Sequence, residues 1–237
     1  MAVLRRVPLR SLIPAAALAC APPARAPPLG GSPRLPAGET RLGLAEERDA
    51  LAYVPPLLHP AKATPLVVFL HGAGGDARRT MPALRELADA YGFVVLAPES
   101  RGYTWDLLLG DVGPDLDFLQ RALDAVKARV RVDREHVALA GFSDGASYAL
   151  TVGLRNRDVF SHVIAFSPGF AGPSRAPQPV VFVSHGTQDA VLPVDASRAI
   201  VARLTGEGCT VTYREFEGGH AVPADVTRDA IRWFLGR

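Results

Sequence analysis

Residues 137–150 read VALAGFSDGASYAL, and they decide the fold of this chain. An apolar, β-prone segment leads into Gly141-Phe142-Ser143-Asp144-Gly145, and a segment suited to a helix follows. A G-x-S-x-G pattern between a strand and a helix is typical of a serine held on a sharp turn above a sheet edge. Glycine is needed on both sides because larger side chains would collide in that turn. The stretch therefore predicts that Ser143 is a nucleophile.

Two partners for this serine follow later in the chain. The run 179–184 resembles a buried strand and leads to Asp189, and the alternating run 210–216 leads to His220. Each residue comes just after a predicted strand, at the edge where a parallel sheet places its catalytic groups. We expect His220 to take the proton of Ser143 and Asp189 to orient His220. Asp195 and Asp144 compete for that last role, but one belongs to the next helix and the other adjoins the nucleophile.

From about residue 41 to its end, the chain resembles the α/β-hydrolase superfamily, in particular the small lidless serine esterases of the phospholipase/carboxylesterase and dienelactone-hydrolase-like types. The order Ser, Asp, His carries the resemblance. So do four motifs: His71-Gly72-Ala73-Gly74-Gly75, Gly141-Phe142-Ser143-Asp144-Gly145, His185-Gly186-Thr187-Gln188-Asp189 and Gly218-Gly219-His220. The resemblance implies an α/β fold with a doubly wound, mostly parallel sheet. Most small carboxylesterases have glutamine after the serine, whereas this chain has Asp144, which leaves the subgroup open.

Two backbone N–H groups are expected to stabilise the oxyanion of the reaction. One belongs to Asp144, at the start of the helix after the nucleophile. By resemblance, the other comes from Ala73, in the glycine-rich loop where the backbone can approach the carbonyl closely. The remaining histidines are weaker candidates for the base, and His71 and His185 are expected to brace loops by hydrogen bonding.

Strands and helices alternate along the rest of the domain, which predicts a parallel sheet covered on both faces. Apolar residues recur at helical spacing over 114–131, and helices are also expected at 78–91, 194–206 and 223–235. Only about a dozen residues separate the strand ending at Phe166 from the next strand at Val180. A cap domain does not fit in this connection, so the site should be open and suited to short or medium acyl groups.

Four residues are candidates for binding the substrate, because they follow strands at the same sheet edge. They are Tyr103, Trp105, Phe170 and Leu192. Each could instead be a core or rim residue.

Composition narrows the function classes. The net charge is +2, but residues 1–38 hold five arginines and no acid, so the rest carries 21 basic against 24 acidic residues. An acidic domain without a basic stripe does not suggest nucleic-acid binding. No spacing of His, Cys, Asp or Glu suggests a metal site, and no cofactor is expected. No feature of the sequence sets the oligomeric state.

The N-terminus resembles an export signal. A basic segment and a short apolar run precede Cys20, as in a bacterial lipoprotein signal whose cysteine carries a lipid anchor. An ordinary secretory signal, a transit peptide and a wrongly assigned start, which would leave the protein in the cytoplasm, are the alternatives. We assign residues 1–20 to the signal, the proline-rich residues 21–40 to a disordered tether, and residues 41–237 to the catalytic domain.

Taken together, these features predict a serine hydrolase that cleaves small-molecule carboxylic esters of short to medium acyl chain through an acyl-enzyme. The same catalytic residues could serve a thioesterase, a peptidase, a polyester depolymerase or an acyltransferase. A catalytically inactive α/β-hydrolase that acts as a binding module is a further alternative.

Overall fold

The computed structural model describes residues 34–59, 61–106, 113–175 and 179–237. The predicted signal segment 1–20, with Cys20, and the predicted tether up to residue 33 lie outside the described residues.

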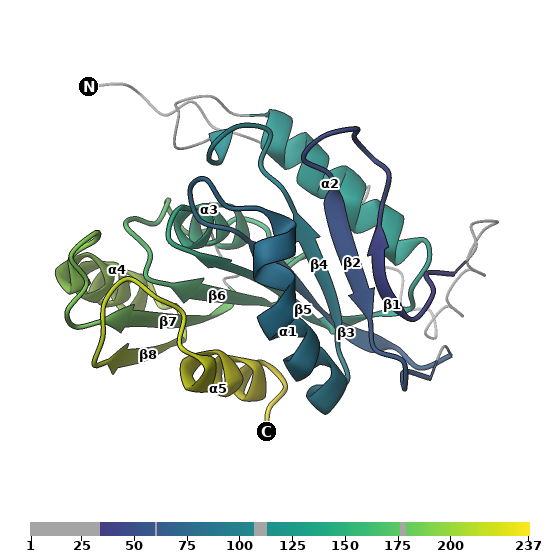
Figure 1. The fold of residues 1–237 in the computed structure, drawn as a ribbon. Helices are drawn as coiled ribbons and strands as arrows, with labels where there is room; N and C mark the ends of the chain where they lie inside the picture. The colour runs from purple at the N-terminus through teal and green to yellow at the C-terminus, as the bar shows by residue number, and fades with distance from the viewer. Residues whose placement is uncertain (1–33, 60, 107–112, 176–178) are drawn as a thin grey trace.

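An eight-stranded sheet forms the centre of the domain (Figure 1). Its strand order is β1-β2-β4-β3-β5-β6-β7-β8. β1 pairs antiparallel with β2, and β2 with β4, while all other pairs are parallel. The strands are β1 Gly38–Arg41, β2 Ala50–Val54, β3 Thr64–Leu70, β4 Val94–Pro98, β5 Val132–Phe142, β6 His162–Phe166, β7 Val180–Gly186 and β8 Val211–Phe216. The expectation of a mostly parallel, doubly wound sheet is confirmed.

Within the described residues, five helices cover both faces of this sheet. They are α1 Ala77–Tyr91, α2 Pro114–Lys127, α3 Asp144–Gly153, α4 Val194–Gly206 and α5 Ala224–Phe234. α1 and α5 lie side by side on one face, and α2, α3 and α4 pack on the other (Figure 1). The central strands are buried between these layers, which explains their continuous apolar sequences.

Local sequence sets where the helices begin and end. The carboxylate of Asp76 accepts from the N–H of Arg79 and caps α1, which ends at Gly92 in the left-handed conformation. Pro114 starts α2, where its missing N–H costs nothing. β6 ends at Phe166 and β7 begins at Val180, so the connection between them is too short for a cap domain.

The first strand corrects the predicted domain boundary. β1 begins at Gly38, inside the segment that we assigned to a disordered tether, and Leu35 is buried in the core. β1 is short and half exposed, and it joins the sheet through its pairing with β2. A strand held mainly by backbone hydrogen bonds needs few apolar side chains, and β1 has none in its sequence GETR. The strand therefore could not be recognised after the proline-rich segment.

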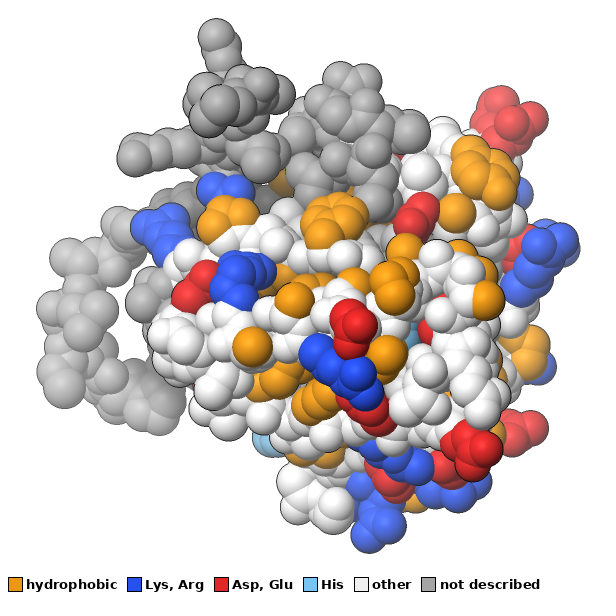
Figure 2. Space-filling model, turned by 90° about the vertical axis from the view of Figure 1, so that its left-hand side faces the viewer, with side chains coloured by type: hydrophobic (Ala, Val, Ile, Leu, Met, Phe, Trp, Pro, Cys, Tyr) orange, Lys and Arg blue, Asp and Glu red, His pale blue; other side chains and the backbone are white. Residues whose placement is uncertain are grey.

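One end of the molecule shows how its surface charge is distributed. Figure 2 looks onto the side of the molecule at which α4 and β8 lie, and acidic, basic and hydrophobic side chains alternate there. Arg198 pairs with both Glu215 of β8 and Asp195 of α4 at this end.

In the described part of the chain, no helix is long and apolar enough to cross a membrane.

Candidate active site

Ser143 stands on a strained turn between β5 and α3. Its φ is 54°, in the left-handed region that non-glycine residues rarely adopt. The N–H of Ser143 donates to the carbonyl of Phe166 at 2.9 Å, which ties the turn to the end of β6. The flanking glycines are required by close packing: a Cβ at Gly141 would lie 2.3 Å from the carbonyl oxygen of Gly145. The turn therefore holds the serine in one place above the sheet.

A continuous hydrogen-bond chain runs from this serine to a buried carboxylate. Ser143 Oγ lies 2.8 Å from Nε2 of His220, and Nδ1 of His220 lies 2.6 Å from Oδ2 of Asp189. An ionised carboxylate only accepts hydrogen bonds, so Nδ1 carries the proton and Nε2 is free to accept from the hydroxyl. The structure thus brings together the three residues that the sequence placed at three separate strand ends.

Asp189 is held in its charged form. Its side chain is fully buried, and burial by itself raises a carboxyl pKa. The N–H groups of Leu192 and Val191 and the ring of His220 all donate to the carboxylate, and together they lower the pKa of Asp189 below its usual value. A charged Asp189 is what a neighbouring imidazole needs in order to accept a proton.

His185 lies behind Asp189 and is completely buried. Its Nε2 lies 2.9 Å from the carbonyl oxygen of Leu192 and 3.1 Å from Oδ2 of Asp189. Both are acceptors, so Nε2 carries a proton, and Nδ1 is left to accept from the hydroxyl of Ser197 at 2.6 Å. The expected bracing role of His185 is seen here, and it extends to the carboxylate itself.

The predicted oxyanion donors belong to segments next to the serine: Asp144 follows it in the chain, and Ala73 follows Gly72, which packs against Ser143. In the part of the chain that the structure describes, neither the N–H of Ala73 nor that of Asp144 donates to another protein group. The side chain of Asp144 accepts from the hydroxyl of Thr104 at 2.7 Å and is thereby held in place. The role of both N–H groups as oxyanion donors stays a prediction.

His71 braces the loop that carries Ala73. Its Nδ1 lies 2.7 Å from the carbonyl oxygen of Gly72, and its Nε2 accepts from the N–H of Ser100. Burial lowers the pKa of His71, which keeps the ring neutral and able to accept.

Trp105 does not have the predicted substrate-binding role. It is 1% exposed, and its ring packs between those of His71 and Tyr148. The indole N–H donates to the carbonyl of His71 at 2.8 Å. A buried tryptophan needs apolar surroundings for its ring and an acceptor for its N–H. Trp105 has both beneath the loop that carries Ala73, so it supports that loop.

The other three predicted binding residues border the site. Tyr103 is 73% exposed, and its carbonyl accepts from the N–H of Gly74. Phe170 is 39% exposed, and its N–H lies 3.4 Å from the hydroxyl of Ser147. Leu192 donates from its backbone to Asp189. All three remain predictions as substrate contacts.

Sequence reasoning missed the part played by Phe142. Its ring lies beside that of His220, with the ring centroids 4.7 Å apart. An aromatic residue directly before the nucleophile was the signal that could have identified this contact.

Comparison with known proteins places the chain among esterases. A protein described as "Putative esterase NocK" from Nocardia uniformis subsp. tsuyamanensis is 29% identical over 143 residues, which cover 55% of this chain and 42% of that protein. The chain therefore matches less than half the length of that relative. Among solved structures, esterase PE8 is 27% identical and matches 77% of this chain and 95% of its own, with a TM-score of 0.60.

Esterase 2 of Thermogutta terrifontis is 19% identical and shares the fold, with a TM-score of 0.67 over 90% of this chain and 96% of its own. The family described as Esterase PHB depolymerase matches residues 49–202. Because this match spans more than half of the chain, the protein is an α/β-hydrolase that belongs to the Esterase PHB depolymerase family.

Proposed function

We propose that the protein is a serine carboxylic-ester hydrolase that uses Ser143 as its nucleophile and works through an acyl-enzyme. The observation that carries this proposal is the hydrogen-bond chain from Ser143 through His220 to Asp189. A serine hydroxyl is a weak nucleophile until a base lies within hydrogen-bond reach and a third group orients that base. His220 is the base within reach of Ser143, and Asp189 is the group that orients it.

The reaction follows from these positions. Ser143 Oγ attacks the ester carbonyl while His220 Nε2 takes its proton, and Asp189 stabilises the imidazolium that forms. The N–H groups of Ala73 and Asp144 receive the oxyanion, and such a donor stabilises the transition state by about 3 kcal/mol. His220 then gives its proton to the leaving alcohol oxygen. In the second half of the reaction, His220 takes a proton from water, and the water oxygen attacks the carbonyl of the acyl-enzyme. The acid leaves, and Ser143 regains its proton from His220.

We further propose a preference for acyl chains of about two to eight carbons. The short connection between β6 and β7 provides no cap to bury a long chain. Each methylene left in water forgoes about 0.8 kcal/mol of burial. Carbons beyond the reach of Phe170 and Leu192 should therefore add little to kcat/KM.

A polyester depolymerase is the second candidate, favoured by the description of the matching family. The absence of a cap between β6 and β7 is compatible with a polymer chain crossing the site. Release of soluble acid from a polyester suspension, compared with hydrolysis of small esters, distinguishes the two substrates.

The proposal is tested by labelling the protein with a fluorophosphonate probe and by measuring hydrolysis of nitrophenyl acetate. We expect wild type to be labelled and active, and Ser143→Ala to be neither, with an unchanged thermal midpoint. Ser174→Ala, which alters a serine between β6 and β7 whose hydroxyl contacts Glu207, is the control and should still be labelled. A folded Ser143→Ala protein that keeps more than about a tenth of the rate would disprove the assignment.

A further inference from the structure

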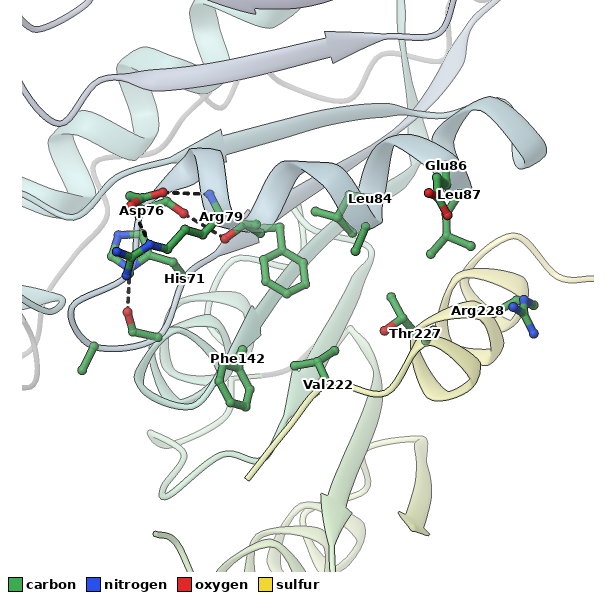
Figure 3. Close-up of a pocket in the computed structure, with 17 residues that line it drawn as sticks. His71, Asp76, Arg79, Leu84, Glu86, Leu87, Phe142, Val222, Thr227 and Arg228 are labelled. Atoms are coloured by element: carbon green, nitrogen blue, oxygen red, sulfur yellow. Dashed lines mark hydrogen bonds and ion pairs between the residues drawn. The ribbon is translucent and has the colours of Figure 1, made fainter. Parts of the chain in front are cut away.

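A cavity of about 420 Å³ lies between α1 and α5, beside the proposed catalytic residues (Figure 3). Its volume is in the range of sites that bind small molecules. Phe69 of β3, Leu84 and Leu87 of α1, and Val222 before α5 contribute to its walls. These four side chains carry no polar atoms, so the wall that they form is apolar.

The cavity shares a wall with the catalytic centre. Gly72 and Ala73 of the oxyanion loop line it, and so does Phe142, which directly precedes Ser143. A Cβ at Gly72 would lie 3.3 Å from both the Phe142 ring and Cβ of Ser143, so loop and nucleophile are in close contact. In Figure 3, Phe142 and Val222 lie at one end of the cavity, and Leu84 and Leu87 extend away from them along α1.

The position of the base, His220, decides which half of an ester would enter this cavity. His220 must deliver its proton to the leaving alcohol oxygen, so the alcohol lies on the His220 side of the reacting carbonyl. Phe142 packs against the His220 ring, and Val222 follows His220 by two residues. The inner end of the cavity is therefore built from the residues that surround the base.

The acyl half has a different place available. Phe170 follows β6 and Leu192 follows β7, and both strands lie on the opposite side of β5 from β3, which forms the floor of the cavity. The two halves of an ester can thus extend in opposite directions from Ser143.

The charged lining residues leave no unpaired charge at the inner end of the cavity, which favours a neutral ligand. Asp76 and Arg79, which lie beside His71 in Figure 3, pair with each other at 3.4 Å. Glu86 and Arg228 are exposed and lie at the end far from Phe142. Water can solvate these groups, whereas a charge on the ligand would have to enter the apolar interior unpaired.

We infer that this cavity binds the alcohol portion of the substrate, and that the substrate is an ester of an apolar, extended alcohol with a short or medium acid. The inference rests on the proposed ester hydrolysis. It assigns the apolar tail to the cleft between α1 and α5, which none of the four substrate-binding residues predicted from sequence lines.

Two ester series test it, with kcat/KM as the readout. One keeps acetate as the acid and extends the alcohol from ethanol to decanol, and the other keeps ethanol and extends the acid from acetate to decanoate. We expect kcat/KM to rise about fourfold for each of the first several methylenes added to the alcohol. The rise across the acid series should be much smaller.

Substitutions on α1 supply the matched variants. Ala83 lines the cavity, so Ala83→Phe should at least halve the dependence of log kcat/KM on alcohol length. Ala90 is exposed on the same helix and does not line it, so Ala90→Phe should keep the wild-type dependence. Inhibition by free 1-octanol is a second measurement that requires no variant, and it should be at least tenfold stronger than inhibition by ethanol.

The outcomes separate this inference from the function on which it rests. If no ester of either series is hydrolysed, the proposed function fails. If esters are hydrolysed but the alcohol series is flat, or the steep rise occurs in the acid series, the inference is wrong and the esterase function stands. An unchanged slope in a folded Ala83→Phe protein, shown by normal fluorophosphonate labelling, would also overturn it.

Discussion

Nε2 of His185 lies 3.1 Å from Oδ2 of Asp189, the same carboxylate oxygen that accepts from His220. Two imidazoles therefore converge on one carboxylate oxygen, one from the reacting side and one from the core. His185 is fixed in turn by Ser197 and by the carbonyl of Leu192. The carboxylate that orients the base is itself oriented by a buried histidine.

Replacing His185 should consequently lower kcat more than it changes KM. We expect His185→Phe to reduce kcat about tenfold, which corresponds to about 1.4 kcal/mol, because it removes the polar N–H group that lies 3.1 Å from the buried carboxylate. Ser197→Ala removes only the support of Nδ1 and should have a smaller effect. Steady-state kinetics on a short ester compares kcat and KM of the two variants with those of wild type, and circular dichroism checks that both variants are folded. Unchanged kcat in folded His185→Phe would show that the contact is not functional.

Asp189→Asn keeps the shape of the side chain and removes its charge. The amide can donate to His220 Nδ1, which favours the tautomer that cannot accept from Ser143. We expect kcat to fall on the order of 10⁴-fold near neutral pH. Single-turnover measurement of acylation checks this value. Glu215→Gln, which alters an exposed ion pair of β8, is the control and should retain activity.

The turn at Ser143 should not tolerate a methyl group at Gly145. A Cβ there would lie 2.3 Å from the carbonyl oxygen of Leu70 and 2.5 Å from that of His71, so backbone would have to move. We expect Gly145→Ala to cost about 3 kcal/mol or more, which corresponds to a fall of roughly 6–12 °C in Tm. Gly206→Ala meets nothing within 4 Å and should leave Tm unchanged or slightly raised. Equal Tm values for the two variants would contradict the packing argument.

The stability of the fold should decline at acidic pH partly through His162. Burial, followed by the charges of His136 and Arg157, lowers the pKa of His162 to about 4. The unfolded chain binds a proton near pH 6.5, so this contribution is complete above pH 6.5 and is lost as the pH falls towards about 4. Tm measured from pH 7.5 to 4 should therefore fall less in His162→Phe than in wild type. His59→Gln changes an exposed histidine and should follow wild type.

Shortening the N-terminus tests where the domain begins. A chain that starts at Arg34 should keep activity and Tm, because all residues of the proposed site and of the described sheet lie within 34–237. A chain that starts at Leu42 lacks both β1 and the buried Leu35, so its Tm should be lower. Equal Tm values for the two would mean that β1 adds nothing to stability. Palmitate labelling of the full chain that depends on Cys20 would support the lipoprotein interpretation.

The alternation of strands and helices after β1, and the three residues of the hydrogen-bond chain, could be predicted from the amino-acid sequence. The end of β6 at Phe166 and the start of β7 at Val180 were recognisable from their apolar runs, because doubly covered strands require apolar side chains. Ser143, Asp189 and His220 were recognisable because each follows a strand of a parallel sheet, and such a sheet gathers these ends at one edge. Local chemistry was sufficient in these cases.

The burial of the aromatic residues and the place where a substrate could bind could not be predicted from the sequence. Trp105 and Tyr103 are two positions apart in one loop, yet the first is buried under His71 and the second is exposed. The apolar cavity lies between α1 and α5, which are far apart in sequence and meet because both pack on the same face of the sheet. Catalytic residues follow from the local pattern of strand and turn, whereas burial and cavities depend on which distant elements pack together.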